Sequence, residues 1–261
     1  MPKANVLNLA MSAPYTEPPL MTGSTHHLEE FVQLLVAGDR IVCRELIDRE
    51  LTACGHADRV YRDLLWPALE KIDKLYRTDR INAAVEHMAT RIARSIADQL
   101  QVHLVVREPN GKTVLISCAD GEPEELGAQM TADLFEARGW KVYFVGGGVP
   151  SDEILGLVGE LMPNLLLVFG TQPSGVPGVR RLVDMVRDIG VNPTMNIMVS
   201  GGVFNRADGL WREVNSDLFA RTATEALELA EASEPRTPTL KVNGTPKKRR
   251  RRRRQVAAVG A

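Results

Sequence analysis

The stretch Leu115-Ile-Ser-Cys-Ala-Asp-Gly-Glu-Pro-Glu-Glu-Leu-Gly127 decides the fold class of this chain. It opens with a short, continuous apolar run, which is typical of a strand buried on both faces of a sheet. A polar loop follows, and Gly127 then lies on the first turn of a helical pattern. A buried strand that passes through a loop into a helix is the first half of a βαβ unit, so the stretch predicts a parallel sheet.

The same alternation continues toward the C-terminus. Short apolar runs predict strands at 113–118, 141–146, 164–169 and 195–200. Helical patterns occur at about 124–138, 150–161, 175–189 and 221–233. We therefore expect a doubly wound parallel sheet with right-handed crossovers, a Rossmann-like or flavodoxin-like fold, over residues 107–233. Ligands of such sheets bind outside the carboxyl ends of the strands.

Residues 26–106 have a helical period instead. Segments at about 26–37, 39–54, 57–77 and 80–100 carry apolar residues at spacings of three and four. Asp39 and Asp79 are placed to begin the second and fourth helices. Pro67 either kinks the third helix or marks an early turn of a later one. Amphipathic helices with short links predict a four-helix antiparallel bundle ahead of the sheet domain.

The overall composition limits the class of protein. Charged residues make up 25% and hydrophobic residues 44% of 261 residues, which is ordinary for a globular chain. There is no run of 18 apolar residues and no signal-peptide pattern, so we expect no membrane span and a cytoplasmic location. The three scattered cysteines favour a reducing compartment and argue against a disulfide framework or a zinc site.

Both ends of the chain differ from the rest. Residues 1–25 lack periodicity, residues 234–261 are rich in Pro, Thr and basic residues, and both are expected to be disordered. Eight consecutive cations lie near the C-terminus: Lys247, Lys248, Arg249, Arg250, Arg251, Arg252, Arg253 and Arg254. Without them, 24 of the 32 basic residues remain against 33 acidic ones. This tail is expected to bind a polyanion such as DNA, or to fold back onto the acidic body.

The loops at the strand ends resemble those of the cobalamin (vitamin B12)-binding domain family. Gly146-Gly-Gly-Val-Pro150 resembles the Gly-x-x-Val-Pro of that family, Phe169-Gly-Thr-Gln-Pro173 its Ser-x-Thr segment, and Ser200-Gly-Gly202 its Gly-Gly turn. In that family these segments enclose the nucleotide tail of cobalamin, which inserts between sheet and helix. The resemblance therefore implies a cofactor-binding role for Gly148, Val149, Pro150, Thr171, Ser200, Gly201 and Gly202. Here Phe169 replaces the usual Ser.

The loop after the first strand resembles the cofactor loop of the same family, Asp/Glu-x-His-x-x-Gly, whose His is the lower ligand to cobalt. The spacing is kept as Glu122-Pro-Glu124-Glu-Leu-Gly127, with Glu124 in the position of the His. A carboxylate is a harder donor than imidazole. Three alternatives follow: cobalamin binds with its own base or another ligand, a haem or bilin takes its place, or no cofactor binds and the domain is a protein-interaction scaffold.

The bundle provides a second resemblance. Photoreceptor regulators of the CarH type carry Trp-x9-Glu-His on the helices that cap the upper face of the cofactor, and this chain has Tyr76, nine residues, then Glu86-His87. An aromatic side chain beside a Glu-His pair suits a planar macrocycle, and the imidazole can bind a metal. The resemblance thus implies that His87 is an axial cobalt ligand, with Tyr76 and Glu86 beside it.

A bundle followed by a cobalamin-type domain looks most like the AerR/PpaA group of antirepressors. This resemblance implies a non-catalytic transcriptional co-regulator that senses light or redox state and acts on a repressor of photosynthesis genes of the PpsR/CrtJ type, with oligomerisation possible. The alternative is a corrinoid carrier protein for methyl transfer, which shares the layout. The pattern Ser/Cys–His–Asp of a nucleophilic enzyme is not evident, since Cys118 has no predicted histidine nearby.

Overall fold

The structure is a computed structural model that describes residues 24–238. Disorder was predicted for residues 1–25 and 234–261, and most of both ranges, together with the cationic run 247–254 and its predicted polyanion binding, falls outside the described residues. Of the part that is described, residues 24 and 25 belong to the first helix, and Arg236 donates a hydrogen bond to Asp217 at 3.0 Å. Within the described part, a helical bundle precedes a sheet domain, so the predicted fold class is confirmed. The predicted boundary at 106/107 lies in the segment between the last bundle helix and the first strand.

The bundle consists of four helical segments. They are α1 (Ser24–Ala37), α2 (Arg40–Cys54), a continuous helix made of α3 (Ala57–Val60), η1 (Tyr61–Leu65) and α4 (Trp66–Arg77), and α5 (Ala83–Gln101). Asp39 caps α2 as predicted, because its side chain accepts a hydrogen bond from the backbone of Val42. The prediction that Asp79 begins the last helix is wrong: Asp79 adopts a positive φ of 55° in the preceding turn, and Asn82 caps α5 instead.

Pro67 changes the helix without ending it. Proline has no N–H, and its ring clashes with the carbonyl four residues earlier in an α-helix. The turn just before it, η1, is a π-helix, whose wider turn relieves this conflict. The helix therefore continues through Trp66 to Arg77, as the apolar spacing predicts.

The second domain is a parallel sheet with the order β2-β1-β3-β4-β5. Its strands are β1 (Thr113–Cys118), β2 (Lys141–Gly146), β3 (Leu165–Phe169), β4 (Asn196–Ser200) and β5 (Leu218–Ala220). Its helices are α6 (Leu126–Ala137), α7 (Ser151–Leu161), η2 (Pro173–Gly175), α8 (Val176–Ile189), α9 (Gly202–Arg206), α10 (Leu210–Glu213) and α11 (Ala223–Ala232). The strand β5 and the short helices α9 and α10 were not predicted, because three to five residues are too few for a periodic pattern.

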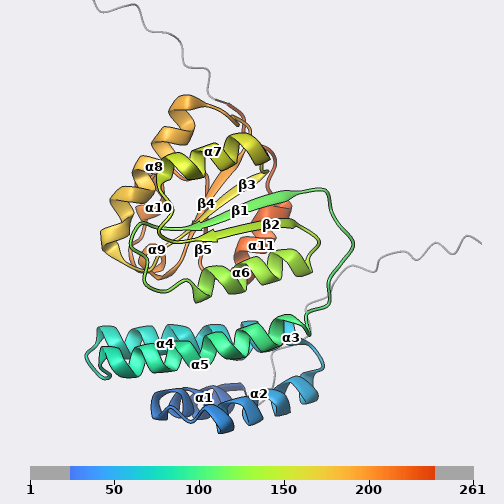
Figure 1. The fold of residues 1–261 in the computed structure, drawn as a ribbon, viewed down its shortest axis with the longest axis vertical. Helices are drawn as coiled ribbons and strands as arrows, with labels where there is room; N and C mark the ends of the chain where they lie inside the picture. Colours follow the sequence, from blue (N-terminus) through green and yellow to red (C-terminus); the bar gives the residue numbers. More distant parts are fainter. Residues whose placement is uncertain (1–23, 239–261) are drawn as a thin grey trace, which may run out of the picture.

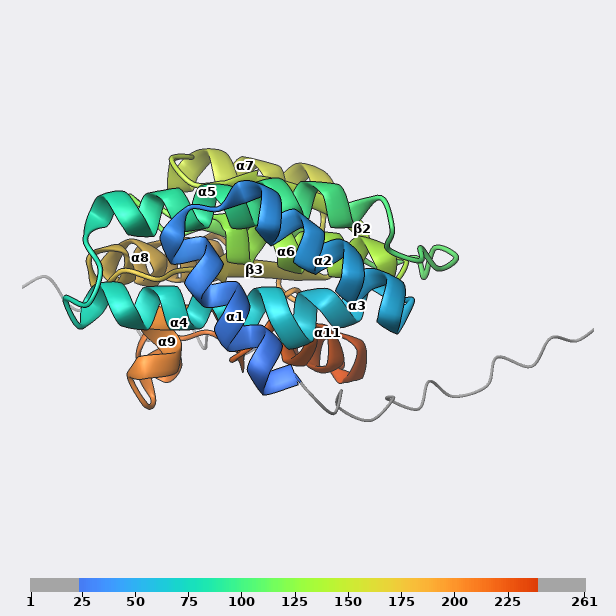
Figure 2. The same ribbon diagram turned by 90° about the horizontal axis from the view of Figure 1, so that it is seen from below.

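The elements stack in layers, from α7 and α8 through the sheet to α6 and α11, and then to the bundle (Figure 1). Helices α4 and α5 face the sheet domain, and α1 and α2 cover them on the outside (Figure 2). Strand residues alternate between the two faces: Leu166 packs toward α7 and α8, while Leu165 and Leu167 pack toward α6 and α11. None of the helices in residues 24–238 is both long and apolar enough to cross a membrane.

A buried polar contact joins the bundle to α6. The Tyr61 hydroxyl lies 2.8 Å from the carbonyl of Ala97 and 3.0 Å from Oδ2 of Asp133, and Gln101 donates to Oδ1 of Asp133 at 3.0 Å. Burial raises the pKa of the Asp133 carboxyl to about 6, and the hydrogen bond from Tyr61 opposes this rise. A protonated Asp133 can donate to Tyr61 while Tyr61 donates to Ala97, which satisfies all three groups.

We expect Asp133 to make the protein less stable as the pH rises. Its folded pKa lies above the unfolded value, so its contribution is complete below about pH 4 and is lost as the pH passes through about 6. The rise in pKa corresponds to about 3 kcal/mol. Urea unfolding between pH 4.5 and 7.5 will reveal a decline in wild-type stability that Asp133→Asn largely lacks. The exposed Glu228→Gln is the control and keeps the wild-type slope; equal slopes for wild type and Asp133→Asn would contradict the assignment.

Candidate functional site

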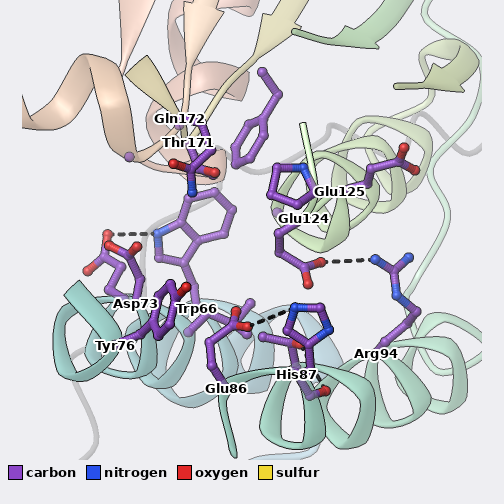
Figure 3. A pocket seen from close by; sticks show the side chains of 18 of the residues that line it. Trp66, Asp73, Tyr76, Glu86, His87, Arg94, Glu124, Glu125, Thr171 and Gln172 are labelled. Carbon is purple, nitrogen blue, oxygen red and sulfur yellow. Dashed lines mark hydrogen bonds and ion pairs between the residues drawn. The ribbon is translucent and has the colours of Figure 1, made fainter. Parts of the chain in front are cut away.

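A cavity of about 540 Å³ lies between the bundle and the carboxyl edge of the sheet. Helices α4 and α5 form one wall, and the loops after β1, β3 and β4 form the other (Figure 3). Open parallel sheets bind ligands at this edge, and a cavity between two domains is a common ligand position. The cavity is therefore the candidate site.

The structure brings most of the predicted site residues to this cavity. The lining includes Tyr76, Glu86, His87, Glu124, Gly127, Thr171, Gly201 and Gly202. The predicted residues that do not line it are Glu122, Gly148, Val149, Pro150 and Ser200. Glu122 is buried and binds Thr171, and the Ser200 hydroxyl donates to the carbonyl of Ala220 at 2.9 Å. Residues 148–150 follow the edge strand β2 and lead into α7.

Glu124 is held by two partners. Its Oε1 accepts a hydrogen bond from Arg94 on α5 at 2.9 Å and another from the backbone N–H of Leu126 at 2.8 Å. The first contact crosses from the sheet domain to the bundle, and the second satisfies a free N–H at the start of α6. Glu124 therefore contributes one contact between the two domains at the cavity, at the position that aligns with the ligand His in the resemblance described above.

His87 and Glu86 lie on the opposite wall. The His87 side chain is 68% exposed, and its Nε2 is 3.6 Å from Oε2 of Glu86 (Figure 3). Burial raises the pKa of the Glu86 carboxyl, His87 lowers it, and Glu124 and Asp73 raise it further. The exposed imidazole is thus available to a ligand and is steadied by a neighbouring carboxyl group.

Two aromatic residues line the α4 wall. Tyr76 was predicted, whereas Trp66 was set aside because it does not fit the Trp-x9-Glu spacing. Trp66 donates from Nε1 to Glu70 at 3.1 Å, and its ring meets Phe169 edge-on at a centroid distance of 6.5 Å. The signal that would have found Trp66 is its spacing from Asp73, which also lines the cavity, since positions seven apart lie close to the same face of a helix.

Arg94, Phe169 and Arg206 are the other important residues that the motifs did not identify as site residues. Arg94 lies on the α5 face that carries His87, seven residues farther on, and it binds Glu124. The guanidinium of Arg206 binds the carbonyl of Thr171 and lies 3.4 Å from Oδ2 of Asp73, so it also links the two domains. Such contacts between residues distant in sequence have no local signal.

At Gly127, Gly201 and Gly202, a Cβ atom would lie very close to other atoms of the protein. A Cβ on Gly201, whose φ is 103°, would lie 2.3 Å from the carbonyl oxygen of Gly170. A Cβ on Gly127 would lie 2.5 Å from the ring of Phe169, and one on Gly202 would lie 2.6 Å from Arg206. Gly201 is therefore required for the close approach of two backbone segments.

We expect the Arg94–Glu124 pair to stabilise the docked domains modestly. In a double-mutant cycle of Arg94→Ala and Glu124→Gln, the coupling in the free energy of unfolding should be about 0.5–1 kcal/mol, since both side chains are about a third exposed. Glutamine keeps an acceptor for Leu126. The control cycle of Arg94→Ala with Glu228→Gln should be additive. A coupling of zero in the first cycle would mean that the ion pair does not stabilise the docking.

Comparisons with known proteins agree with this architecture. Two family models, both described as B12 binding domain, match residues 27–101 and residues 112–231. Dimethylamine corrinoid protein 2 of Methanosarcina mazei is 20% identical over 113 residues, which cover 43% of this chain and 51% of that protein. The chain thus spans about half the length of that curated relative.

Other relatives match over more of their length. A corrinoid protein of Desulfitobacterium hafniense is 21% identical over 213 residues, covering 78% of this chain and 95% of that protein. The solved structure of the monomethylamine corrinoid protein of Methanosarcina barkeri superposes with a TM-score of 0.72 at 16% identity, covering 79% of this chain and 98% of the other. At this identity the likeness supports the fold.

Proposed function

Because this chain belongs to the B12-binding domain family, we propose that it is a non-catalytic corrinoid-binding protein whose ligand lies in the cavity between α4, α5 and the sheet edge. The observation that carries the proposal is the exposed imidazole of His87, which lies across the cavity from the strand-end loops. The family match supports a corrinoid and gives no support to the haem and bilin alternatives.

The cavity suits the flat ring of a corrinoid. Trp66 and Tyr76 offer apolar surface to a macrocycle, and the bundle places them beside His87. His87 would bind the metal, and Glu86 would orient its imidazole. Glu124 would stay with Arg94 and act as a domain tether, because its ion pair weakens it as a metal donor.

We assign the protein a carrier role, in which it presents the corrinoid to a partner enzyme. A bound corrinoid would supply a cobalt centre that accepts and releases a methyl group. The residues of this chain would bind the ring, exclude water from one of its faces and orient it. The corrinoid protein relatives support this role.

The first test is a titration with hydroxocobalamin followed by absorption spectroscopy. We expect the wild type to bind with a spectral shift, and His87→Ala to bind at least about tenfold more weakly with most of the shift lost. His103→Ala is the matched control, because His103 is exposed and does not line the cavity, and it should behave as wild type. Equal spectral shifts in wild type and His87→Ala would show that His87 does not bind the cobalt. No binding by the wild type would refute the proposed function.

A second candidate function is the antirepressor role. It would use the contacts that cross the cavity, Arg94–Glu124 and Arg206–Asp73, because a ligand that touches both walls can alter how the domains dock. A changed docking would expose or hide a surface for a repressor of the PpsR/CrtJ type. In this role the cationic run 247–254 would add affinity for DNA.

The two functions differ in an operator-binding assay with such a repressor. An antirepressor lowers the affinity of the repressor for its operator, and hydroxocobalamin should change the effect at least about threefold. Deletion of residues 247–254 should flatten the salt dependence if the tail contacts DNA. A corrinoid carrier leaves the repressor–operator affinity unchanged, with or without ligand, and that result would exclude the antirepressor role.

A further inference from the structure

Beneath the cavity, the crevice between the loops after β1 and β3 is filled by side chains of the protein. With the strand order β2-β1-β3-β4-β5, the chain reverses direction between β1 and β3, and the loops after these strands flank the usual binding crevice. Cys118 pairs with Phe169 at the ends of the two strands, so both loops leave the sheet at the same level. Side chains of the protein itself occupy the space between them.

Phe169 fills the inner part of the crevice. Its ring is 4% exposed and lies against Gly127, where a Cβ would be only 2.5 Å from the ring. The ring also meets Trp66 of the bundle edge-on. Phe169 is therefore the floor of the cavity, and it separates the cavity from the space between β3 and α6.

Hydrogen bonds close the outer part. Glu122, in the loop after β1, accepts hydrogen bonds from both the backbone N–H and the hydroxyl of Thr171, in the loop after β3. The guanidinium of Arg206 binds the carbonyl of the same Thr171. At the end of β2, Glu125 accepts a hydrogen bond from Gly147 at 2.8 Å and lies where a Cβ of Gly146 would stand. Hydrogen bonds thus connect the loop after β1 to the loops after β2 and β3.

The charged residues that line the cavity also disfavour binding of the nucleotide tail. Its lining carries five carboxyl groups, Glu70, Asp73, Glu86, Glu124 and Glu125, against two arginines, Arg91 and Arg94. Arg94 is paired with Glu124, and Asp73 is paired with Arg77 and Arg206, so Glu70, Glu86 and Glu125 remain against Arg91. A cationic cobalt centre suits this balance, whereas the phosphodiester in the nucleotide tail of cobalamin is repelled by it.

Building on the proposed function, we infer that this protein recognises the corrin ring alone and leaves the nucleotide tail of its ligand outside the fold. Phe169 is the specificity-determining residue, because it fills the crevice that an inserted tail would need. The ligand class is therefore corrinoids in general, with any lower base or with none.

The test compares cobalamin with cobinamide, which has the same ring without the nucleotide. We expect the wild type to bind aquacobalamin and diaquocobinamide with dissociation constants that agree within about threefold. Phe169→Ala opens the crevice and should favour cobalamin by at least about tenfold. Phe169→Leu keeps much of the bulk and should retain the wild-type ratio. The ratio of the two dissociation constants, measured on one preparation, does not depend on the folded fraction. A destabilised variant therefore still reports the preference between cobalamin and cobinamide.

The outcomes separate this inference from the proposed function. Binding of cobalamin more than about tenfold tighter than cobinamide by the wild type would mean that the tail is inserted and would overturn the inference, while corrinoid binding stands. An unchanged ratio in Phe169→Ala would also overturn the role of Phe169. Failure of the wild type to bind either corrinoid would refute the proposed function itself.

Discussion

The arrangement of the whole molecule depends on the packing of α6 between two layers. One side of this helix packs into the core of the bundle through Leu126, Met130 and Leu134. The other side packs against the sheet through Ala128, Ala132 and Phe135. Because α6 has apolar neighbours on both sides, it packs the two domains against each other. The cavity lies at the N-terminal end of α6, so its geometry follows from this packing.

The packing of α6 against the bundle also explains why Glu124 pairs with Arg94. The residue lies just before α6, within reach of α5, and there it serves the domain contact through Arg94. Metal binding by this position would compete with that ion pair and with the cap on Leu126. In the proposed function, the imidazole on the cavity wall that would bind the metal is His87, on the bundle. The metal ligand would then come from the bundle, while the sheet domain provides the floor of the cavity through Phe169.

Much of this could be predicted from the sequence, and the reasons are physical. Buried strands and amphipathic helices have strong periodic patterns, so the ends of the bundle helices and of the four longer strands were predicted to within three residues. The strand β5 was missed because three residues carry no period, and Asp79 was misassigned because two capping residues lie close together in one turn. Motif spacing brought His87 and Glu124 to the same cavity. It could not reveal that Arg94 binds Glu124 or that Phe169 packs against Trp66, since these contacts depend on how the domains dock.

One measurement tests whether a histidine of this chain binds the cobalt of a corrin ring, with His87 as the expected ligand. The protein is produced with ¹⁵N-imidazole histidine, loaded with reduced cob(II)inamide, and examined by electron paramagnetic resonance. Cobinamide has no base of its own, so a nitrogen splitting must come from the protein. We expect each cobalt line to be split into two by one ¹⁵N nucleus, and into three when the histidine is unlabelled. Signals without nitrogen splitting would contradict this expectation.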